Sequence, residues 1–280
     1  VFNVVLDPVL IFGIGPFPVL GVSGAAAATV TAQALVSLLF FKAVLREKVL
    51  FPHLRLWVLV PVKVWREIVR IGVPSAVQNL IYAGISMILT RLITGWGDLA
   101  VAAQRVGSQI ESVSWMVGDG FSAAVNAFLG QNYGAKRYDR VRRGYFCAIA
   151  MTAAWGLCTT FLLIGMARPL FSIFLQEEEV MAIGVNYLRI VGLSQMFMMV
   201  EQTSIGAFSG LGRTLYPSIV SVTFTSARIP VAVLLSSVMG LSGIWWALSI
   251  SSMVKGCILF VSFVVFLYVF LERKKDEKTV

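Results

Sequence analysis

Long apolar segments follow one another along nearly the whole chain of 280 residues. Hydrophobic residues make up 58% of the sequence and charged residues 13%, whereas a soluble domain has about 25% charged residues. A bilayer core about 30 Å thick is crossed by about 20 apolar residues in a helix. The pattern therefore predicts an all-α, polytopic membrane protein whose main partner is the lipid bilayer. Eight spans are expected, at residues 1–13, 22–45, 68–94, 99–129, 141–165, 180–210, 214–239 and 241–271.

Positive charge is concentrated in alternate loops between these spans. Residues 42–70, residues 136–143, Arg213 and the tail from Arg273 together carry 17 of the 23 Lys and Arg residues. The 166–179 loop instead carries three consecutive glutamates. By the positive-inside rule, we expect a protein of the plasma or inner cell membrane whose basic loops and C-terminus are cytoplasmic. This interpretation replaces nucleic-acid binding as the explanation for the net charge of +9.

The sequence contains few residues of the types that metal-dependent or nucleophilic chemistry requires. His53 is the single histidine, and Cys147, Cys158 and Cys257 are isolated in apolar segments. Neither a metal site nor a disulfide framework is expected from such spacing. Gly130–Ala135 lacks the Gly-Lys-Ser/Thr ending of a phosphate-binding loop, so ATP-driven transport is not expected either. We therefore predict that the protein is not an enzyme and binds no cofactor. The ion that we expect it to bind is a coupling ion, H⁺ or Na⁺.

A short repeat indicates two related halves. Gly21–Ala28 (GVSGAAAA) recurs 219 residues later as Gly240–Ala247 (GLSGIWWA), with six spans between the copies. An even number of spans preserves orientation, as in transporters built from parallel repeats. On this basis, four helices of a first lobe, about 160 residues, are expected before residue 1. The predicted domains are the last two helices of that N-lobe (1–46), a cytoplasmic linker (47–66), a six-helix C-lobe (67–271) and a cytoplasmic tail (272–280).

Polar residues recur at helical spacing within several of these apolar spans. A polar side chain facing lipid is unfavourable, so such stripes indicate faces turned toward protein or water. Hydrogen bonding between helices is the competing interpretation, above all for Ser and Thr. The stripes supply the candidate cavity residues Gln78, Asn79, Tyr82, Gln104, Glu111, Asp119, Asn126, Gln195, Met196, Glu201 and Arg228.

Glu111, Asp119 and Glu201 are the candidate residues for ion coupling. A carboxyl group in a low-dielectric cavity can exchange a proton for a cation. Next to methionines and aromatic rings, it suits small cationic or aromatic substrates, although plain packing also explains the methionines. Cations within the spans, such as Arg228 and Lys255, could instead neutralise the acids. A Glu201 held by such a cation would be structural, and the sequence leaves this open.

Several segments, taken in order, resemble multidrug and toxic compound extrusion (MATE) transporters. The resemblance implies a MATE-like helical bundle of twelve helices in two lobes. It also implies export of cationic, often aromatic, compounds driven by H⁺ or Na⁺, by alternating access in a single full-length chain. The resembling segments are Asn3–Gly13 with Gly21–Thr29 (fifth and sixth helices), Gly130–Ala135 (after the eighth), Tyr187–Ile190 with Gly210–Thr214 (tenth), and Arg228–Pro230 with Gly240–Gly243 (eleventh and twelfth).

Two positions within this resemblance need separate comment. Some MATE transporters use an acidic residue on the seventh helix, but Tyr82 lies near that place here, so the role is not carried over. Gly130 and Gly134 are expected to form a structural hinge in the loop after the eighth helix, because glycine permits tight turns.

Other functions compatible with two lobes stay open. A flippase or exporter of lipid-linked oligosaccharides or polysaccharides shares the architecture, but it would favour an arginine-rich cavity for phosphate. A pore or a structural membrane subunit is a further class. A membrane enzyme has the least support, since no nucleophile and base are paired. The acids in the stripes favour an antiporter for organic cations or drugs.

Overall fold

The computed structural model describes residues 2–14, 18–46 and 61–276, with side-chain environments up to residue 269. All regular structure in these ranges is helical, as the sequence predicts. Two compact units are formed, Val1–Pro61 and Val62–Val280. Most of the expected linker 47–66, including His53, and the last four residues of the expected tail lie outside the described ranges. The division into lobes therefore stays a prediction.

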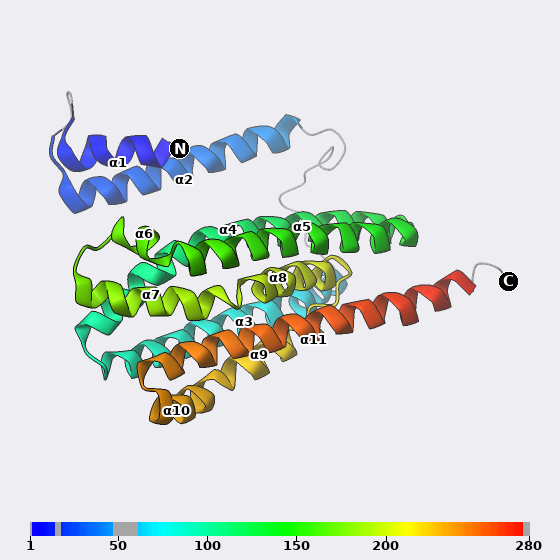
Figure 1. Ribbon diagram of the computed structural model, residues 1–280. Coiled ribbons are helices and arrows are strands. Elements are labelled where there is room, and N and C mark those ends of the chain that lie inside the picture. The colour runs from blue at the N-terminus through cyan, green and yellow to red at the C-terminus, as the bar shows by residue number, and fades with distance from the viewer. Residues whose placement is uncertain (1, 15–17, 47–60, 277–280) are drawn as a thin grey trace. The chain divides into compact units, whose positions relative to one another are not determined.

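The first unit is a helical hairpin of α1 (Phe2–Phe12) and α2 (Gly21–Arg46) (Figure 1). The two helices approach closely at Gly24, where an added Cβ would lie 2.4 Å from the carbonyl oxygen of Leu10. Small residues allow such close packing between membrane helices. The Asn3 side-chain amide also donates a hydrogen bond to the Thr29 hydroxyl, at 3.4 Å. The absence of a side chain at Gly24, in the GVSG motif, thus allows α1 and α2 to pack closely.

The second unit is a bundle of helices that run alongside one another (Figure 1). Its elements are α3 (Val62–Thr94), α4 (Asp98–Gly134), α5 (Tyr138–Gly165), α6 (Ala167–Ser172), α7 (Glu178–Gly192), α8 (Gln195–Gly210), α9 (Leu215–Ser226), α10 (Arg228–Met239) and α11 (Leu241–Asp276).

Two of the expected spans are interrupted. The 180–210 span consists of α7 and α8, which meet at an angle of 50° around Leu193 and Ser194. The 214–239 span breaks at Ala227 into α9 and α10, although residues 215–239 together still qualify as one apolar span. Pro230 lies just after this break and cannot donate a backbone hydrogen bond to the preceding turn. The short helix α6 was not predicted.

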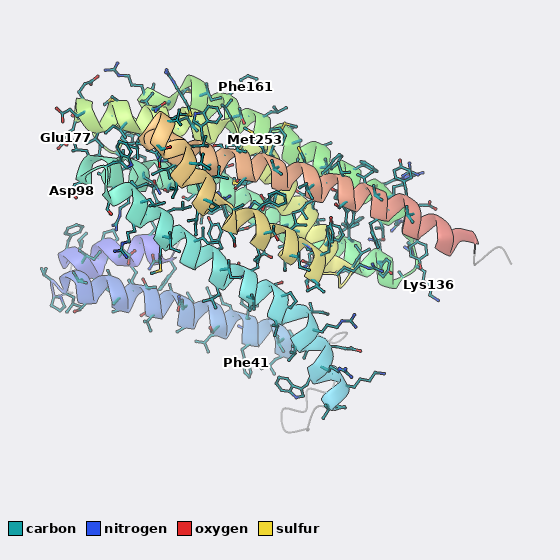
Figure 2. The ribbon with its side chains drawn as sticks, turned by 90° about the horizontal axis from the view of Figure 1, so that it is seen from below. Phe41, Asp98, Lys136, Phe161, Glu177 and Met253 are labelled. Atoms are coloured by element: carbon teal, nitrogen blue, oxygen red, sulfur yellow. The ribbon has the colours of Figure 1, made fainter. Side chains whose placement is uncertain are left out.

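Five helices in the described residues are long and apolar enough to cross a membrane, or six if α7 and α8 count as one span. The sequence predicted eight. Helix α1 has only 11 residues, and the 37-residue α4 is long enough but carries the polar stripe. Large apolar side chains such as Phe161 (73% exposed) lie on the outside of the second unit (Figure 2). These features are those of a multi-pass membrane protein.

Glycines on α8 determine how closely it packs against α4. A Cβ at Gly206 would lie 2.4 Å from the carbonyl oxygen of Ser122, and one at Gly210 would lie 2.5 Å from that of Asn126. Gly130 faces the carbonyl oxygen of Gly210, at 3.0 Å from its own would-be Cβ. Spacing of small residues by four lets the two backbones touch.

The sequence predicted a structural hinge in a loop at Gly130 and Gly134, and the structure differs from this prediction. Both residues lie within α4, so the prediction of a loop there is wrong. Gly130 instead permits close packing of α4 against α8. The turn comes later, at Lys136, whose φ of 56° is in the left-handed region.

Charge separates toward the two ends of this bundle. Asp98 and Glu177 lie at one end and Lys136 at the other (Figure 2). At the acidic end, Arg168 and Glu178 form an exposed ion pair at 2.7 Å. The separation agrees with the pattern of the loops, while the assignment of the basic end to the cytoplasm stays a prediction.

Candidate functional site

Two of the cavities in the described part of the second unit share a wall of two aromatic rings. The Glu111 cavity has a volume of about 360 Å³ and lies among α3, α4, α7, α8, α10 and α11. The Asp119 cavity has a volume of about 390 Å³ and lies among α3, α4, α8, α9 and α11. Tyr82 on α3 and Trp115 on α4 line both, with ring centroids 6.0 Å apart. Residues of the polar stripe of α4 thus line both cavities.

The carboxylate of Glu111 is held by two neutral donors. The Tyr187 hydroxyl donates to Oε2 at 3.1 Å, and the side-chain amide of Gln195 donates to Oε1 at 3.0 Å. Tyr187 belongs to α7, whereas Gln195 is the first residue of α8. The ring of Tyr187 fits against α4 at Gly107, where an added Cβ would lie 2.3 Å from it. The acid is therefore fixed in position without a cation to neutralise it at contact distance.

A second layer of contacts holds the tyrosine in place. The Trp245 ring packs edge-on against Tyr187, with centroids 5.4 Å apart. Its indole N–H donates to the side-chain oxygen of Gln104 at 3.3 Å, and Gln104 in turn lines the Glu111 cavity. Edge-to-face pairs of this kind are favourable beyond the area they bury. Gln104 therefore belongs to the site both as a lining residue and as a support.

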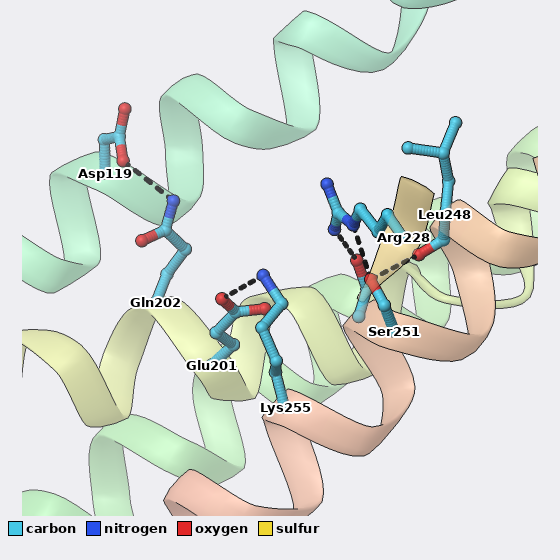
Figure 3. A network of polar contacts seen from close by, with 8 residues as sticks. Asp119, Glu201, Gln202, Arg228, Leu248, Ser251 and Lys255 are labelled. Atoms are coloured by element: carbon cyan, nitrogen blue, oxygen red, sulfur yellow. Dashed lines mark hydrogen bonds and ion pairs between the residues drawn. The ribbon is translucent and has the colours of Figure 1, made fainter. Parts of the chain in front are cut away.

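Arg228 lies at the start of α10 and also lines the Glu111 cavity. It is buried, and its guanidinium group donates hydrogen bonds to the hydroxyls of Ser251 and Ser252 on α11 (Figure 3). Arg228 takes part in neither the Arg168–Glu178 nor the Glu201–Lys255 ion pair. At contact distance its hydrogen-bond partners are thus neutral hydroxyl groups, while Glu111 acts on it electrostatically from the same cavity.

Glu201 and Lys255 form a buried ion pair in the Asp119 cavity. The distance between the Lys255 Nζ and the Glu201 Oε1 is 2.7 Å, and the two side chains are 6% and 9% exposed (Figure 3). This is the structural alternative that the sequence left open for Glu201. A carboxylate so close to an ammonium group is already neutralised, which makes it a poor site for a cation.

Asp119 has a more open environment. It is exposed, and its Oδ1 accepts a hydrogen bond from the side-chain amide of Gln202 at 3.2 Å (Figure 3). Gln78 and Asn79 on α3 line the same cavity. Together with Tyr82 and Glu201, five of the predicted site residues therefore line one cavity.

Three predicted residues line neither cavity: Gln195, which reaches Glu111 through its hydrogen bond, Asn126 and Met196. Asn126 is exposed on α4, where its backbone oxygen packs against Gly210. Met196 packs against α5, since a Cβ at Gly156 would lie 2.6 Å from its Cα. Met198, two residues further on, lines the Glu111 cavity instead. The bend before α8 changes which methionines face inward.

Sequence reasoning missed Ser251 and Ser252 as partners of Arg228. The two serines lie in the expected 241–271 span, where neighbouring residues on a helix point in different directions. A pair of adjacent serines in an apolar segment was the available signal. In the described part of the chain, no three His, Cys, Asp or Glu residues come together as metal ligands.

Residues 74–234 match the model of the MatE family. The chain belongs to the MatE family. A probable multidrug resistance protein NorM from Thermotoga maritima is 30% identical over 256 residues, which cover 87% of this chain. An FAD transporter from Shewanella oneidensis is 26% identical over 262 residues, or 91% of this chain. The chain spans 53% and 57% of the lengths of these two relatives.

The fold of this MatE chain is likewise that of solved transporters. It aligns with the outward-facing conformation of a multidrug resistance MATE family transporter, with a TM-score of 0.86 and 20% sequence identity. The alignment covers 97% of this chain and 61% of that one. The resemblance and the fold class that the sequence predicted are confirmed.

Proposed function

We propose that this chain is part of a secondary antiporter that exports organic cations or drugs in exchange for H⁺ or Na⁺, by alternating access of two lobes. The main support is the arrangement around Glu111. Its carboxylate is fixed by Tyr187 and Gln195, both neutral, and lines a cavity together with the rings of Tyr82 and Trp115. A carboxylate in such a cavity attracts either a proton or a cation.

Exchange follows from this competition for one carboxylate. When Glu111 binds a proton, it no longer attracts a cationic substrate, and when the proton leaves, the substrate can bind. The rings of Tyr82 and Trp115 offer faces to a cationic or aromatic molecule. A volume of about 360 Å³ lies at the lower end of the range for small-molecule pockets.

The other acids take different parts in this proposal. Asp119 is accessible and borders the second cavity, where it offers an auxiliary cation site. Glu201 is assigned a structural role because Lys255 neutralises it. The basic loops are proposed to face the cytoplasm of a cell membrane, with one full-length chain as the functional unit and no nucleic-acid partner.

The names of the relatives bear on the alternatives. The two relatives described above are named for multidrug resistance and for FAD transport, and neither name refers to lipid-linked saccharides. The FAD transporter is of interest because FAD carries negative charge, so cargo in this family need not be purely cationic. A drug exporter remains the function that the Glu111 cavity supports best.

The test uses the full-length protein reconstituted in vesicles. Efflux of a fluorescent organic cation is measured under an imposed H⁺ gradient and, separately, an imposed Na⁺ gradient. We expect one gradient to drive efflux and Glu111→Gln to lower it at least about tenfold, which corresponds to about 1.4 kcal/mol. Gradient-independent leakage of the dye would instead indicate a pore and contradict the proposal.

A further inference from the structure

A buried arginine faces the Glu111 cavity with hydroxyl groups as its partners. Arg228 is 6% exposed, Ser251 and Ser252 hold its Nε and Nη2, and Tyr82 lies beside the guanidinium. Taking a charge out of water is unfavourable unless an opposite charge compensates it. The acid that acts electrostatically on Arg228 is Glu111, which lines the same cavity but does not form an ion pair with it at contact distance.

Lys255 is a second buried cation, and it lies on α11 together with Ser251 and Ser252. Its ammonium group lies 2.7 Å from the carboxylate of Glu201. Both buried cations line cavities, but Lys255 is paired with an acid at contact distance, whereas Arg228 is held by hydroxyl groups. This difference indicates that the charge of Arg228 is kept for something that enters the cavity.

The surroundings of Arg228 also orient it. The Ser251 hydroxyl donates to the backbone oxygen of Leu248 at 3.3 Å, so its lone pairs are directed to the guanidinium (Figure 3). Two hydrogen bonds from different nitrogen atoms fix the plane of the group. A planar guanidinium held in this way matches the two oxygens of a carboxylate or phosphate group.

We propose that Arg228 binds an anionic group of the transported molecule, and that the Glu111 cavity takes aromatic zwitterions. The acid group of the ligand lies at Arg228, its amine at Glu111, and its rings against Tyr82 and Trp115, since all four side chains line this cavity. Transport of such a ligand rests on the proposed function above, whereas its binding does not.

Rhodamine B and its ethyl ester make a matched pair of probes. They share the ring system and the cationic amine, and only the acid has a carboxylate. Binding of both dyes to the purified full-length protein is measured by fluorescence anisotropy. We expect Arg228→Gln to weaken binding of the acid about tenfold, equivalent to about 1.4 kcal/mol, and not to weaken binding of the ester, which loses a repelling positive charge.

Several variants separate this role from a general loss of structure. Arg228→Lys retains the charge without the planar group and is expected to lose less than Arg228→Gln. Ser252→Ala removes one positioning hydrogen bond and should weaken binding of the acid alone, about threefold. The matched control is Arg189→Gln, an exposed arginine on α7, which should change neither dye. Ester binding reports on folding in each variant.

The outcomes distinguish the binding site from the transport function. Equal weakening of both dyes by Arg228→Gln and Arg228→Lys, or tighter binding of the ester by the unaltered protein, would overturn the proposal for Arg228. Binding of the acid that depends on Arg228, without gradient-driven export of either dye, would support the site and contradict the antiporter.

Discussion

The Glu111 cavity and the Asp119 cavity share the rings of Tyr82 and Trp115, yet their charges are balanced in different ways. In the Asp119 cavity, Glu201 and Lys255 neutralise each other at 2.7 Å. In the Glu111 cavity, the acid has neutral donors as its hydrogen-bond partners, and Arg228 is held by serine hydroxyls. An internal ion pair stabilises a fixed arrangement, whereas charges without a close partner are available to a ligand.

This comparison explains why the number of acids in a membrane bundle is a poor guide to coupling. Glu111 and Glu201 both lie on polar helix faces and both line cavities. They differ in the residue that lies across from them, and that depends on how the helices are placed against each other. Variants that remove one charge at a time can break or sharpen the distinction.

The largest effect is expected for Lys255→Met. It leaves Glu201 buried without its cation, and loss of one partner from a buried pair costs about 3–5 kcal/mol. Thermal unfolding of the purified full-length protein measures the loss. The double variant Glu201→Leu/Lys255→Met should recover most of it, and Arg168→Gln, which breaks the exposed pair, should cost less than about 1 kcal/mol. A small effect of Lys255→Met would contradict the burial of this ion pair inside the helical bundle.

Next in size is the effect of Glu111→Gln on pH dependence. In the unaltered protein, acidification should weaken binding of a cationic dye, because a protonated carboxyl group no longer attracts a cation. We expect about a tenfold change in affinity between pH 8 and pH 5, and a flat profile in the variant. Fluorescence titration at each pH is the measurement, with Glu179→Gln as the control at an exposed acid. If the variant kept the pH profile, the proton would bind elsewhere.

A moderate effect is expected for Trp115→Ala, which removes part of the wall between the cavities. Loss of the aromatic contact should weaken dye binding by about 0.5–1.5 kcal/mol. Trp155→Ala provides a matched control, because Trp155 lies on α5 and lines neither cavity. Equal binding by the two variants, measured by anisotropy, would show that the shared wall is not part of the binding surface.

The smallest effect is expected for Asp119→Asn. Asp119 is exposed and shares a hydrogen bond with Gln202, and exposed charge interactions contribute up to about 1 kcal/mol. Export of a fluorescent cation should therefore fall by about threefold or less, with membrane insertion unchanged. An effect as large as that of Glu111→Gln would show that the two cavities act as one site.

Much of the helical framework could be predicted from the sequence, because apolar length and polar periodicity are local properties. The expected 99–129 span corresponds to α4, and its polar stripe brings Gln104, Glu111 and Trp115 to a cavity. The same stripe continues to Ser122 and Asn126, but there it packs against the glycines of α8. Periodicity identifies a face turned away from lipid, without saying whether water or a helix covers it.

Pairing between distant helices was beyond the reach of this reasoning. Glu201 and Lys255 are 54 residues apart, and their contact depends on the register of α8 against α11. The bend between α7 and α8 follows Gly192, and Met198 rather than Met196 lines the cavity after it. These features arise from the placement of whole helices, which a single sequence does not report.

The bend between α7 and α8 has a consequence for how ion binding can be converted into movement. One carboxylate accepts hydrogen bonds from Tyr187 before the bend and from Gln195 after it. A proton on one oxygen of Glu111 reduces the capacity of that oxygen to accept hydrogen bonds, and so weakens one of these two bonds. In the antiporter proposed above, the angle between α7 and α8 would thereby depend on whether one carboxylate oxygen carries a proton.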